Sequence, residues 1–255
     1  MKALGIILAG GNSSRMQNLS EKRAISAMSV ACSYRCIDFV LSNMTNSNIQ
    51  TVAVLSQYNA RSLNEHLNSS KWWNFGRKQG GLFLFTPTVT SDNSWWYRGT
   101  ADAMWQNIDF LKKRHEPYVV IASGDCVSKM DFNEILEYHI AKQSDITVVC
   151  AKLPEWEDPK RFGVVKMDME GKILEFEEKP MVAGSDIVST GVYVIRRRTL
   201  IELLEQSNEE GRYNFVTDVL IRQKGLKKIY GYMLDGYWSN IASVDSYYRT
   251  NMDFL

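Results

Sequence analysis

The sequence lacks any hydrophobic run long enough to cross a bilayer, and it lacks an excess of charge of one sign. Its apolar runs, such as residues 4–9 and 118–122, have the length of strands, whereas a transmembrane helix needs roughly 20 apolar residues. The 30 Lys and Arg residues face 29 Asp and Glu residues, which gives a formal net charge of +1. Without a global positive field, neither nucleic acid nor a membrane surface is an expected partner.

Cysteine is scarce and shows no pairing pattern. The four cysteines, Cys32, Cys36, Cys126 and Cys150, have no Cys-x-x-Cys spacing, and the chain shows no signal peptide. Disulfides persist in oxidising compartments, which proteins reach through such a signal. We therefore expect a reduced, cytoplasmic protein.

Internal repeats, low-complexity tracts and linkers are also missing, so we expect a single domain over residues 1–255. β-Branched and aromatic runs alternate with helical patterns. The strand-like runs cover residues 4–9, 51–55, 82–86, 118–122, 146–151 and 188–195. The helical patterns cover residues 36–47, 60–68, 101–115, 132–142, 199–206 and 244–254. This alternation predicts an α/β fold with a mixed, mostly parallel sheet flanked by helices. Residues 162–168 and 173–177, around Gly171-Lys172, predict a small antiparallel insertion.

A glycine-rich turn, Gly10-Gly11-x-x-Ser14-Arg15, follows the first strand pattern. Paired glycines let backbone N–H groups approach a polyphosphate, and the planar charge of an arginine suits phosphate oxygens. The turn matches neither the Walker loop nor the dinucleotide fingerprint, so another nucleotide chemistry is expected. For a Gly-Gly pair alone, a tight turn beside a surface arginine is the preferred interpretation.

Asp125 follows the strand pattern of residues 118–122 in the run Ser123-Gly124-Asp125. Open α/β sheets bind ligands at the carboxyl ends of their parallel strands, so a metal ligand is expected there. An aspartate in an ordinary turn accounts equally well for a single Gly-Asp pair.

Two further segments offer ligand groups. The run 95–103 presents aromatic faces and then small residues at a helix start, where Asp102 is placed as a cap and a flat base has room to lie. Core packing with a cap explains the same run.

Lys179, between Glu178 and the rigid Pro180, suits a compact phosphate, although most such triplets are solvated turns.

Taken in order, these segments resemble the sugar-1-phosphate nucleotidyltransferase family, in particular its ADP-glucose pyrophosphorylase (glucose-1-phosphate adenylyltransferase) branch. The matching runs are residues 8–15, 21–24, 37–43, 97–103, 162–164, 178–180 and 237–238. The resemblance implies the Rossmann-like fold of nucleotide-diphospho-sugar transferases. It also implies the conversion of ATP and glucose 1-phosphate into ADP-glucose and pyrophosphate, in glycogen biosynthesis. Members usually carry a C-terminal left-handed β-helix, and this chain shows no such repeat.

The resemblance also implies roles for particular residues. Arg15 would hold the departing pyrophosphate and Lys22 an ATP phosphate, with adenine seated at Gly99 and Thr100. The positions expected to bind the nucleotide are Gly10, Gly11, Gln57, Gly99, Thr100 and Asp102.

For the other substrate and the metal, the resemblance points to the second half of the chain. Glu178 and Lys179 would hold glucose 1-phosphate, helped by Gly163 and Ser189. Asp125 would ligate Mg²⁺, which reactions between two anions need for charge neutralisation.

Two departures from the family motifs bear on activity. The catalytic subunits read Lys-Arg-Ala-Lys-Pro-Ala, whereas this chain has Ile25 in place of the second lysine. The Tyr-Trp-x-Asp-x-Gly-Thr motif carries Asn240 at the second metal-binding carboxylate. Removing one well-placed charge from a transition state commonly costs ~10²–10³ in rate. We therefore expect a weak or partial Mg²⁺ site at Asp125 and the degenerate position Asn240.

This pattern resembles the GlgD-type subunit of the bacterial enzyme, which is thought to associate with the catalytic subunit and modify its activity. The first hypothesis is a regulatory subunit of a hetero-oligomer with the catalytic ADP-glucose pyrophosphorylase subunit, weakly active alone. The alternative is a fully active sugar-1-phosphate nucleotidyltransferase, in which Asp125 alone anchors the metal.

Overall fold

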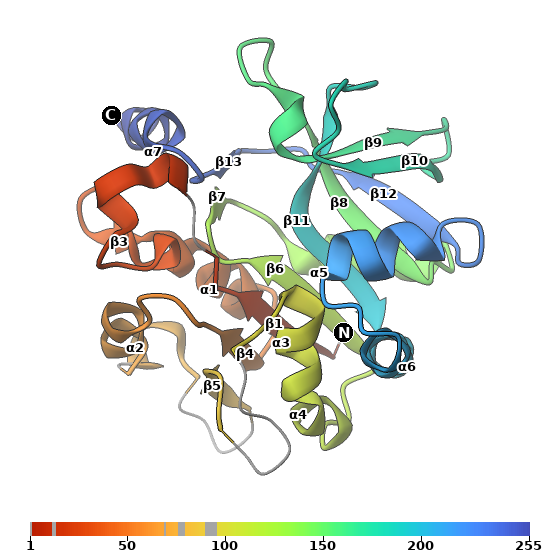
Figure 1. Ribbon diagram of the computed structural model, residues 1–255, viewed down its shortest axis with the longest axis horizontal. Coiled ribbons are helices and arrows are strands. Elements are labelled where there is room, and N and C mark those ends of the chain that lie inside the picture. Colours follow the sequence, from red (N-terminus) through yellow and green to blue (C-terminus); the bar gives the residue numbers. More distant parts are fainter. Residues whose placement is uncertain (1, 12–13, 69, 76–79, 90–95) are drawn as a thin grey trace. The chain divides into compact units, whose positions relative to one another are not determined.

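The computed structural model describes residues 2–11, 14–68, 70–75, 80–89 and 96–255 (Figure 1). The chain divides into two compact units. The first unit consists of Lys2–Trp96, Ile121–Phe132 and Gly236–Leu255, and the second contains Tyr97–Val120 and Asn133–Asp235. The expectation of one domain over residues 1–255 stays a prediction.

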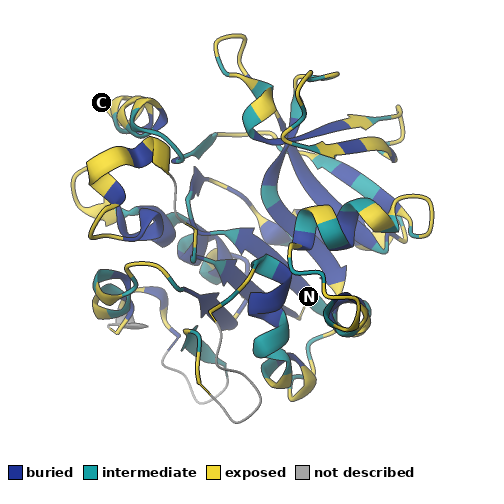
Figure 2. Cartoon of the chain, in the orientation of Figure 1, coloured by how far each residue is buried: buried dark blue, intermediate teal, exposed yellow. Residues whose placement is uncertain are grey.

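The first unit is built on a parallel sheet. Strand β1 (Ala3–Leu8) pairs with β4 (Thr51–Leu55), and β4 pairs with β5 (Gly81–Phe85), all in parallel. Strand β6 (Tyr118–Ser123) begins in the second unit and ends in the first. Figure 2 shows β1 and β4 in the buried colour along nearly their whole length, as expected for parallel strands covered on both faces. The three predicted strands are confirmed to within one residue.

Helix α1 (Cys36–Asn46) illustrates how local sequence sets an element of this unit. The Asp38 carboxylate accepts the backbone N–H of Arg35 at 2.8 Å, which satisfies a donor at the start of the helix. Ile37, Leu41 and Met44 lie on the buried side. The other elements of the unit are η1 (Ser14–Ser20), η2 (Ile25–Ala27), β2 (Ser29–Val30), β3 (Tyr34–Arg35), α2 (Arg61–Leu67), η3 (Ser70–Trp73), β7 (Cys126–Ser128), β13 (Trp238–Asn240) and α7 (Val244–Met252).

The second unit has a mixed sheet. Strand β11 (Ile187–Arg196) runs antiparallel to β8 (Ile146–Lys152), and β12 (Ile229–Met233) runs parallel to β8 on its other side (Figure 1). Strands β9 (Gly163–Met167) and β10 (Ile173–Glu178) form the predicted antiparallel hairpin. Strand β12 was not predicted from the sequence. Its residues are alternately buried and half-buried along most of its length, as is typical of a strand.

The hairpin turn shows why a glycine stands between β9 and β10. Gly171 has a φ of +85°, and a β-carbon there would lie 2.5 Å from the Tyr138 hydroxyl oxygen. The Asp168 carboxylate closes the turn by accepting the backbone N–H groups of Glu170 and Lys172, each at 2.9 Å. The backbone conformation therefore favours glycine, and a β-carbon would in addition displace the Tyr138 hydroxyl.

One predicted helix is corrected. The pattern over residues 101–115 forms two helices, α3 (Thr100–Gln106) and α4 (Ile108–Lys112), separated at Asn107. The Asn107 side chain donates to the carbonyl of Ala103 at 2.9 Å and to the Tyr97 hydroxyl at 3.0 Å. Such side-chain bonds compete with the helical ladder, which ends α3 here. The remaining helical elements are α5 (Phe132–Ala141), η4 (Pro159–Arg161), α6 (Arg197–Glu209), the π-helix η5 (Phe215–Leu220) and η6 (Ile221–Gln223).

The fold class is as predicted, a mixed, mostly parallel sheet flanked by helices. Small antiparallel pairs, β2 with β3 and β7 with β13, accompany the main strands. The parallel pairs come from strands separated by helices. The β9–β10 and β2–β3 pairs join strands that are close in the sequence, whereas β7 pairs with β13 from more than a hundred residues away.

A strained turn in the first unit leads to a stability prediction. Between β2 and β3, Ala31 and Cys32 have φ values of +48° and +65°, a region unfavourable for residues with a β-carbon. Replacing Cys32 with glycine is expected to raise the free energy of unfolding by about 0.5–1 kcal/mol. Urea denaturation measures this, with Cys32→Ser as a control that keeps the β-carbon and leaves stability unchanged. Lower stability of Cys32→Gly would contradict the prediction.

Candidate active site

The glycine turn leaves the carboxyl end of β1 next to its parallel neighbour β4. The backbone N–H of Ala9 donates to the Leu55 carbonyl at 2.8 Å. A β-carbon added at Gly10 would lie 3.5 Å from the Gln57 β-carbon, and one at Gly11 would meet nothing within 4 Å. The structure thus brings three predicted nucleotide-binding residues together, while residues 12–13 of the turn lie outside the described residues.

The two predicted phosphate-binding cations follow this turn. Arg15 lies in η1, which is kinked at Gln17, and Lys22 lies just beyond the end of η1. Both side chains are exposed. Charged groups in water keep their hydration until a ligand arrives, so both cations are available to an anion that binds beside the turn.

The two predicted metal positions lie next to each other in the first unit, Asp125 in the turn just before β7 and Asn240 at the end of the neighbouring strand β13. Asn240 of β13 pairs with Cys126 of β7, and the backbone N–H of Ile241 donates to the Asp125 carbonyl at 2.8 Å. The Asp125 carboxylate is half-buried and accepts the Ser123 hydroxyl at 2.5 Å. Residues separated by more than a hundred positions are therefore neighbours at this point.

Cys126 connects the two metal positions, a role that sequence reasoning missed. The amide nitrogen Nδ2 of Asn240 donates to Cys126 Sγ at 3.4 Å, and Sγ donates to Asp125 Oδ1 at 3.6 Å. Burial, and next the charge of Asp125, raises the pKa of the Cys126 thiol, so the sulfur stays protonated and can act as this donor. The amide of Asn240 is thereby oriented with its nitrogen on the sulfur.

The donor set suits magnesium only in part. Mg²⁺ prefers oxygen ligands and is commonly held by one or two carboxylates together with water and substrate phosphates. Asp125 offers one carboxylate, and Asn240 offers one neutral carbonyl oxygen. Among the described residues, no group of three or more His, Cys, Asp or Glu side chains could hold a metal ion. Magnesium therefore fits here only with further oxygens from a nucleotide and from water.

Ile25, which replaces a family lysine, lies inside the protein. It is 4% exposed and packs in an apolar cluster that also contains Ile241, the residue after the degenerate metal position. A lysine at this position, as in the family motif, would place an ammonium group among these side chains, at a high desolvation cost. The cluster consists of Met16, Ile25, Met28, Val30, Cys36, Val127 and Ile241. Ile25 therefore contributes to this apolar cluster, and the chain has no charge at this position.

In the second unit, the predicted adenine-binding turn packs against a segment that the sequence did not single out. A β-carbon at Gly99 would lie 2.3 Å from the Tyr213 carbonyl oxygen. The Thr100 hydroxyl accepts the backbone N–H of Phe215 at 2.9 Å. Gly99 and Thr100 are half-buried. The φ of 178° at Gly99 is open to any residue, so the backbone conformation does not require glycine here. The close approach of the Tyr213 backbone does, because it leaves no room for a β-carbon.

Asp102 lies in the first turn of α3, whose N-cap is Gly99. Its side chain is fully buried and accepts the Arg98 guanidinium at 2.9 Å, the Arg98 backbone N–H at 2.9 Å and the Gln106 amide at 2.9 Å. The carboxylate is therefore occupied by protein donors. Its predicted contribution to nucleotide binding, which stays a prediction, would act through Arg98, a residue that the motif contained but that was given no role.

The predicted sugar-phosphate residues meet at the start of the β9–β10 hairpin. Glu178 pairs with Gly163, and the backbone N–H of Lys179 donates to the Phe162 carbonyl at 3.0 Å. Lys179 has a φ of +48°, and its Nζ lies 3.4 Å from Glu178 Oε1. A non-glycine residue in the left-handed region is strained, which is frequent at ligand sites.

Ser189 on β11 is placed differently from the other predicted sugar-phosphate residues. It is 7% exposed, and its hydroxyl donates to the Tyr193 hydroxyl at 3.1 Å and accepts the Gly191 N–H at 3.3 Å. It lies next to the irregularity that interrupts pairing between β11 and β8. Its hydroxyl is committed to this bulge, so contact with a sugar phosphate stays a prediction.

The sequence was compared with protein families and with known proteins. A family model described as "Nucleotidyl transferase" matches residues 4–255. Curated proteins named glucose-1-phosphate adenylyltransferase are similar, among them those of Thermosipho africanus (38% identical over 254 residues, covering 98% of this chain and 61% of the relative) and Bacillus cereus (38% identical over 258 residues, covering 100% and 68%). The chain thus spans about three fifths to two thirds of the length of these relatives.

A solved structure supports the fold independently. A Bacillus anthracis protein assigned as a glucose-1-phosphate thymidylyltransferase superposes with a TM-score of 0.80 at 20% identity, covering 99% of this chain and 95% of that one. At this identity the likeness concerns the fold alone. Among the described residues, no helix combines the length and hydropathy needed to cross a membrane. Since the family model extends over nearly all of its sequence, the chain belongs to the nucleotidyl transferase family.

Proposed function

We propose that this chain is a subunit of a glucose-1-phosphate adenylyltransferase that acts in glycogen biosynthesis. In the reaction, a phosphate oxygen of glucose 1-phosphate attacks the α-phosphorus of ATP, the bond to the β-phosphate oxygen breaks, and ADP-glucose and pyrophosphate form. The similarity to proteins of that name supports the proposal, as do the motif residues, which the structure groups in each unit. ATP, glucose 1-phosphate and ADP-glucose are the proposed ligands.

The first unit is proposed to bind the phosphates of the nucleotide. The open space at Gly11 lets backbone N–H groups approach the phosphate oxygens. Arg15 and Lys22, both exposed, would bind the pyrophosphate that leaves and an ATP phosphate, and Gln57 borders the turn. Held in this way, the departing group carries its negative charge next to fixed cations, which lowers the barrier to its departure.

The second unit is proposed to bind adenine and the sugar phosphate. Gly99 and Thr100 present a turn for the base, whose position is fixed by contacts with residues 213–215. Lys179 offers a compact positive charge to the glucose 1-phosphate, while Glu178 and Gly163 shape the same end of the hairpin. Bound Mg²⁺ supplies charge neutralisation for the phosphates, and Asp125 and Asn240 are the residues that would hold it.

The chain is further proposed to be a GlgD-type regulatory subunit, weakly active alone and associated with a catalytic subunit. One observation carries this part of the proposal: the side chain beside Asp125 is the amide of Asn240, and its nitrogen is bonded to Cys126. A neutral amide oxygen binds Mg²⁺ less well than a carboxylate oxygen does. The site therefore provides one negative charge where the family motif provides two.

Replacing Asn240 with aspartate is expected to raise the rate of the isolated chain by about 10²-fold, because it restores a charged metal ligand. Pyrophosphate release from ATP and glucose 1-phosphate with Mg²⁺ measures the rate. Asn208→Asp in α6 makes the same change of charge elsewhere and is expected to leave the rate unchanged. We leave Ile25 in place, because a lysine there would disrupt the apolar cluster.

Two results would contradict the proposal in different ways. If the unmodified chain alone turns over at roughly 1–10³ s⁻¹, as ordinary enzymes do, the regulatory assignment fails and the fully active enzyme is correct. If the chain binds neither ATP nor ADP-glucose with or without Mg²⁺, the adenylyltransferase assignment itself fails.

A further inference from the structure

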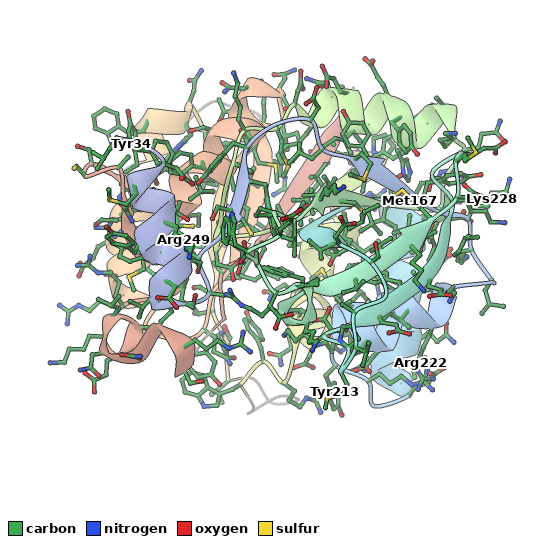
Figure 3. The ribbon with its side chains drawn as sticks, turned by 90° about the horizontal axis from the view of Figure 1, so that it is seen from above. Tyr34, Met167, Tyr213, Arg222, Lys228 and Arg249 are labelled. Carbon is green, nitrogen blue, oxygen red and sulfur yellow. The ribbon has the colours of Figure 1, made fainter. Side chains whose placement is uncertain are left out.

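We propose that Tyr213 and Asp218 are positioning residues for the adenine base, acting through the turn at Gly99 and Thr100. The inference rests on the proposed function, since it assumes that this turn receives the base. Tyr213 is labelled in Figure 3, and all residues concerned belong to the second unit. Neither residue belongs to a motif identified in the sequence.

The backbone of residue 213 anchors the start of α3. The Tyr213 carbonyl accepts the N–H groups of Ala101 at 2.8 Å and of Asp102 at 3.2 Å. These are among the donors that the first turn of a helix leaves without a partner inside the helix. The Phe215 N–H on the Thr100 hydroxyl adds a third contact, at 2.9 Å. The position of the turn is therefore set by a segment more than a hundred residues further along the chain.

The side chain of Tyr213 holds Arg98 on the other side of the same turn. The guanidinium carbon of Arg98 lies 3.8 Å from the centroid of the Tyr213 ring, and Nη1 donates to the tyrosine hydroxyl at 2.8 Å. Nη2 bonds the buried carboxylate of Asp102. A stacked and doubly bonded guanidinium has few orientations left to it.

This arrangement differs from a fully buried structural ion pair. The Arg98 side chain remains 42% exposed although its orientation is fixed. Its charge is balanced by the buried carboxylate of Asp102, so the exposed part of the pair is a planar guanidinium whose Nη1 and Nη2 already have hydrogen-bond partners. Such a group suits the stacking of a nucleobase better than the binding of a phosphate. The geometry therefore points to the base and not to the triphosphate as the group that Tyr213 helps to place.

Asp218 fixes the segment that carries Tyr213. Its Oδ2 accepts the backbone N–H groups of Tyr213 at 3.1 Å and of Asn214 at 2.9 Å, and its Oδ1 accepts the Thr217 hydroxyl at 3.1 Å. These bonds favour the ionised carboxylate, and the bond from Asn214 contributes most to lowering its pKa. Without this acceptor, the Tyr213 carbonyl would lose its defined position against α3.

The test uses Tyr213→Phe, which removes one hydroxyl and keeps the ring, and Asp218→Asn, which removes the charge. Calorimetry on the full chain measures the Kd for ATP and for tripolyphosphate, which carries the phosphates without a base. We expect each variant to weaken ATP binding about 10- to 150-fold, as for loss of a hydrogen bond involving a charged group. Tripolyphosphate binding is expected to stay within about twofold of the unmodified chain.

Tyr248→Phe, at an exposed position of α7, is the matched control and is expected to leave both affinities unchanged. If ATP binding is unchanged in Tyr213→Phe and Asp218→Asn, the inference is overturned while the proposed function stands. The same follows if ATP and tripolyphosphate weaken equally, because the effect is then on the fold. If the unmodified chain binds tripolyphosphate but not ATP, the proposed function fails, and the inference fails with it.

Discussion

Replacing Gly99 with alanine is expected to lower the free energy of unfolding by about 3 kcal/mol and to abolish measurable ATP binding. The new β-carbon would lie 2.3 Å from the carbonyl oxygen and 2.7 Å from the carbonyl carbon of Tyr213. Both are backbone atoms, so no side-chain rotation relieves the clash. The start of α3 must move away from Tyr213, which breaks its hydrogen bonds to Ala101 and Asp102.

Gly11→Ala provides the control for Gly99→Ala. A β-carbon at Gly11 meets nothing within 4 Å, so the free energy of unfolding is expected to change by less than about 0.5 kcal/mol. Denaturant unfolding of both variants, followed by the circular dichroism of the helices, measures the difference. Equal stability of the two variants would show that the contact between Gly99 and Tyr213 is looser than the structure has it.

Acid is expected to destabilise the protein through His139, by about 3 kcal/mol between pH 7 and pH 4. This side chain in α5 is 1% exposed, and its Nδ1 lies 2.8 Å from the Thr147 hydroxyl. Within the described residues, its Nε2 has no hydrogen-bond partner. Burial, and next the positive charge of Arg196, lowers the pKa of His139 from 6.5 to about 4, against the opposing effect of Asp145.

The sign of the effect follows from proton binding. Between pH 6.5 and about 4, the unfolded chain binds a proton at residue 139 that the folded chain does not bind. Stability is therefore complete above pH 6.5 and decreases as the pH falls through this range. The variant His139→Asn keeps a polar atom near the position of Nδ1 but cannot titrate.

Unfolding free energies of the variant and the unmodified chain, compared at pH 7 and pH 4, isolate this contribution from that of the other titrating groups. When the pH falls from 7 to 4, the free energy of unfolding of the unmodified chain is expected to fall by about 3 kcal/mol more than that of His139→Asn. An equal fall in both proteins would show that the buried imidazole accepts its proton without cost.

The sequence predicted the elements that depend on local patterns. The apolar run at residues 51–55 is a strand with these bounds, and the Gly171 turn joins the predicted hairpin. The single long helix over residues 101–115 was wrong, because the side chain of Asn107 bonds back to Ala103 and interrupts it. Hydrophobic periodicity does not record such a side-chain bond.

The candidate site stays a prediction, but the structure brings several of its residues together. Asp125, just before β7, lies next to Asn240 of β13, and Gly163, Glu178 and Lys179 lie at one end of a hairpin. What each side chain faces was not predictable. Ile25 lies within the apolar cluster, whereas the motif alone indicated only that a charge is missing there.

The sequence by itself determined the family and the fold class, since these depend on local order and residue type. Only the tertiary structure decided which partners the candidate site residues have. Arg98 meets Tyr213 across 115 positions, and Asn240 meets Cys126 across 114. The physical reason is that hydrogen bonds and packing require proximity within a few ångströms, and folding brings distant segments to that distance in a way that no local pattern records.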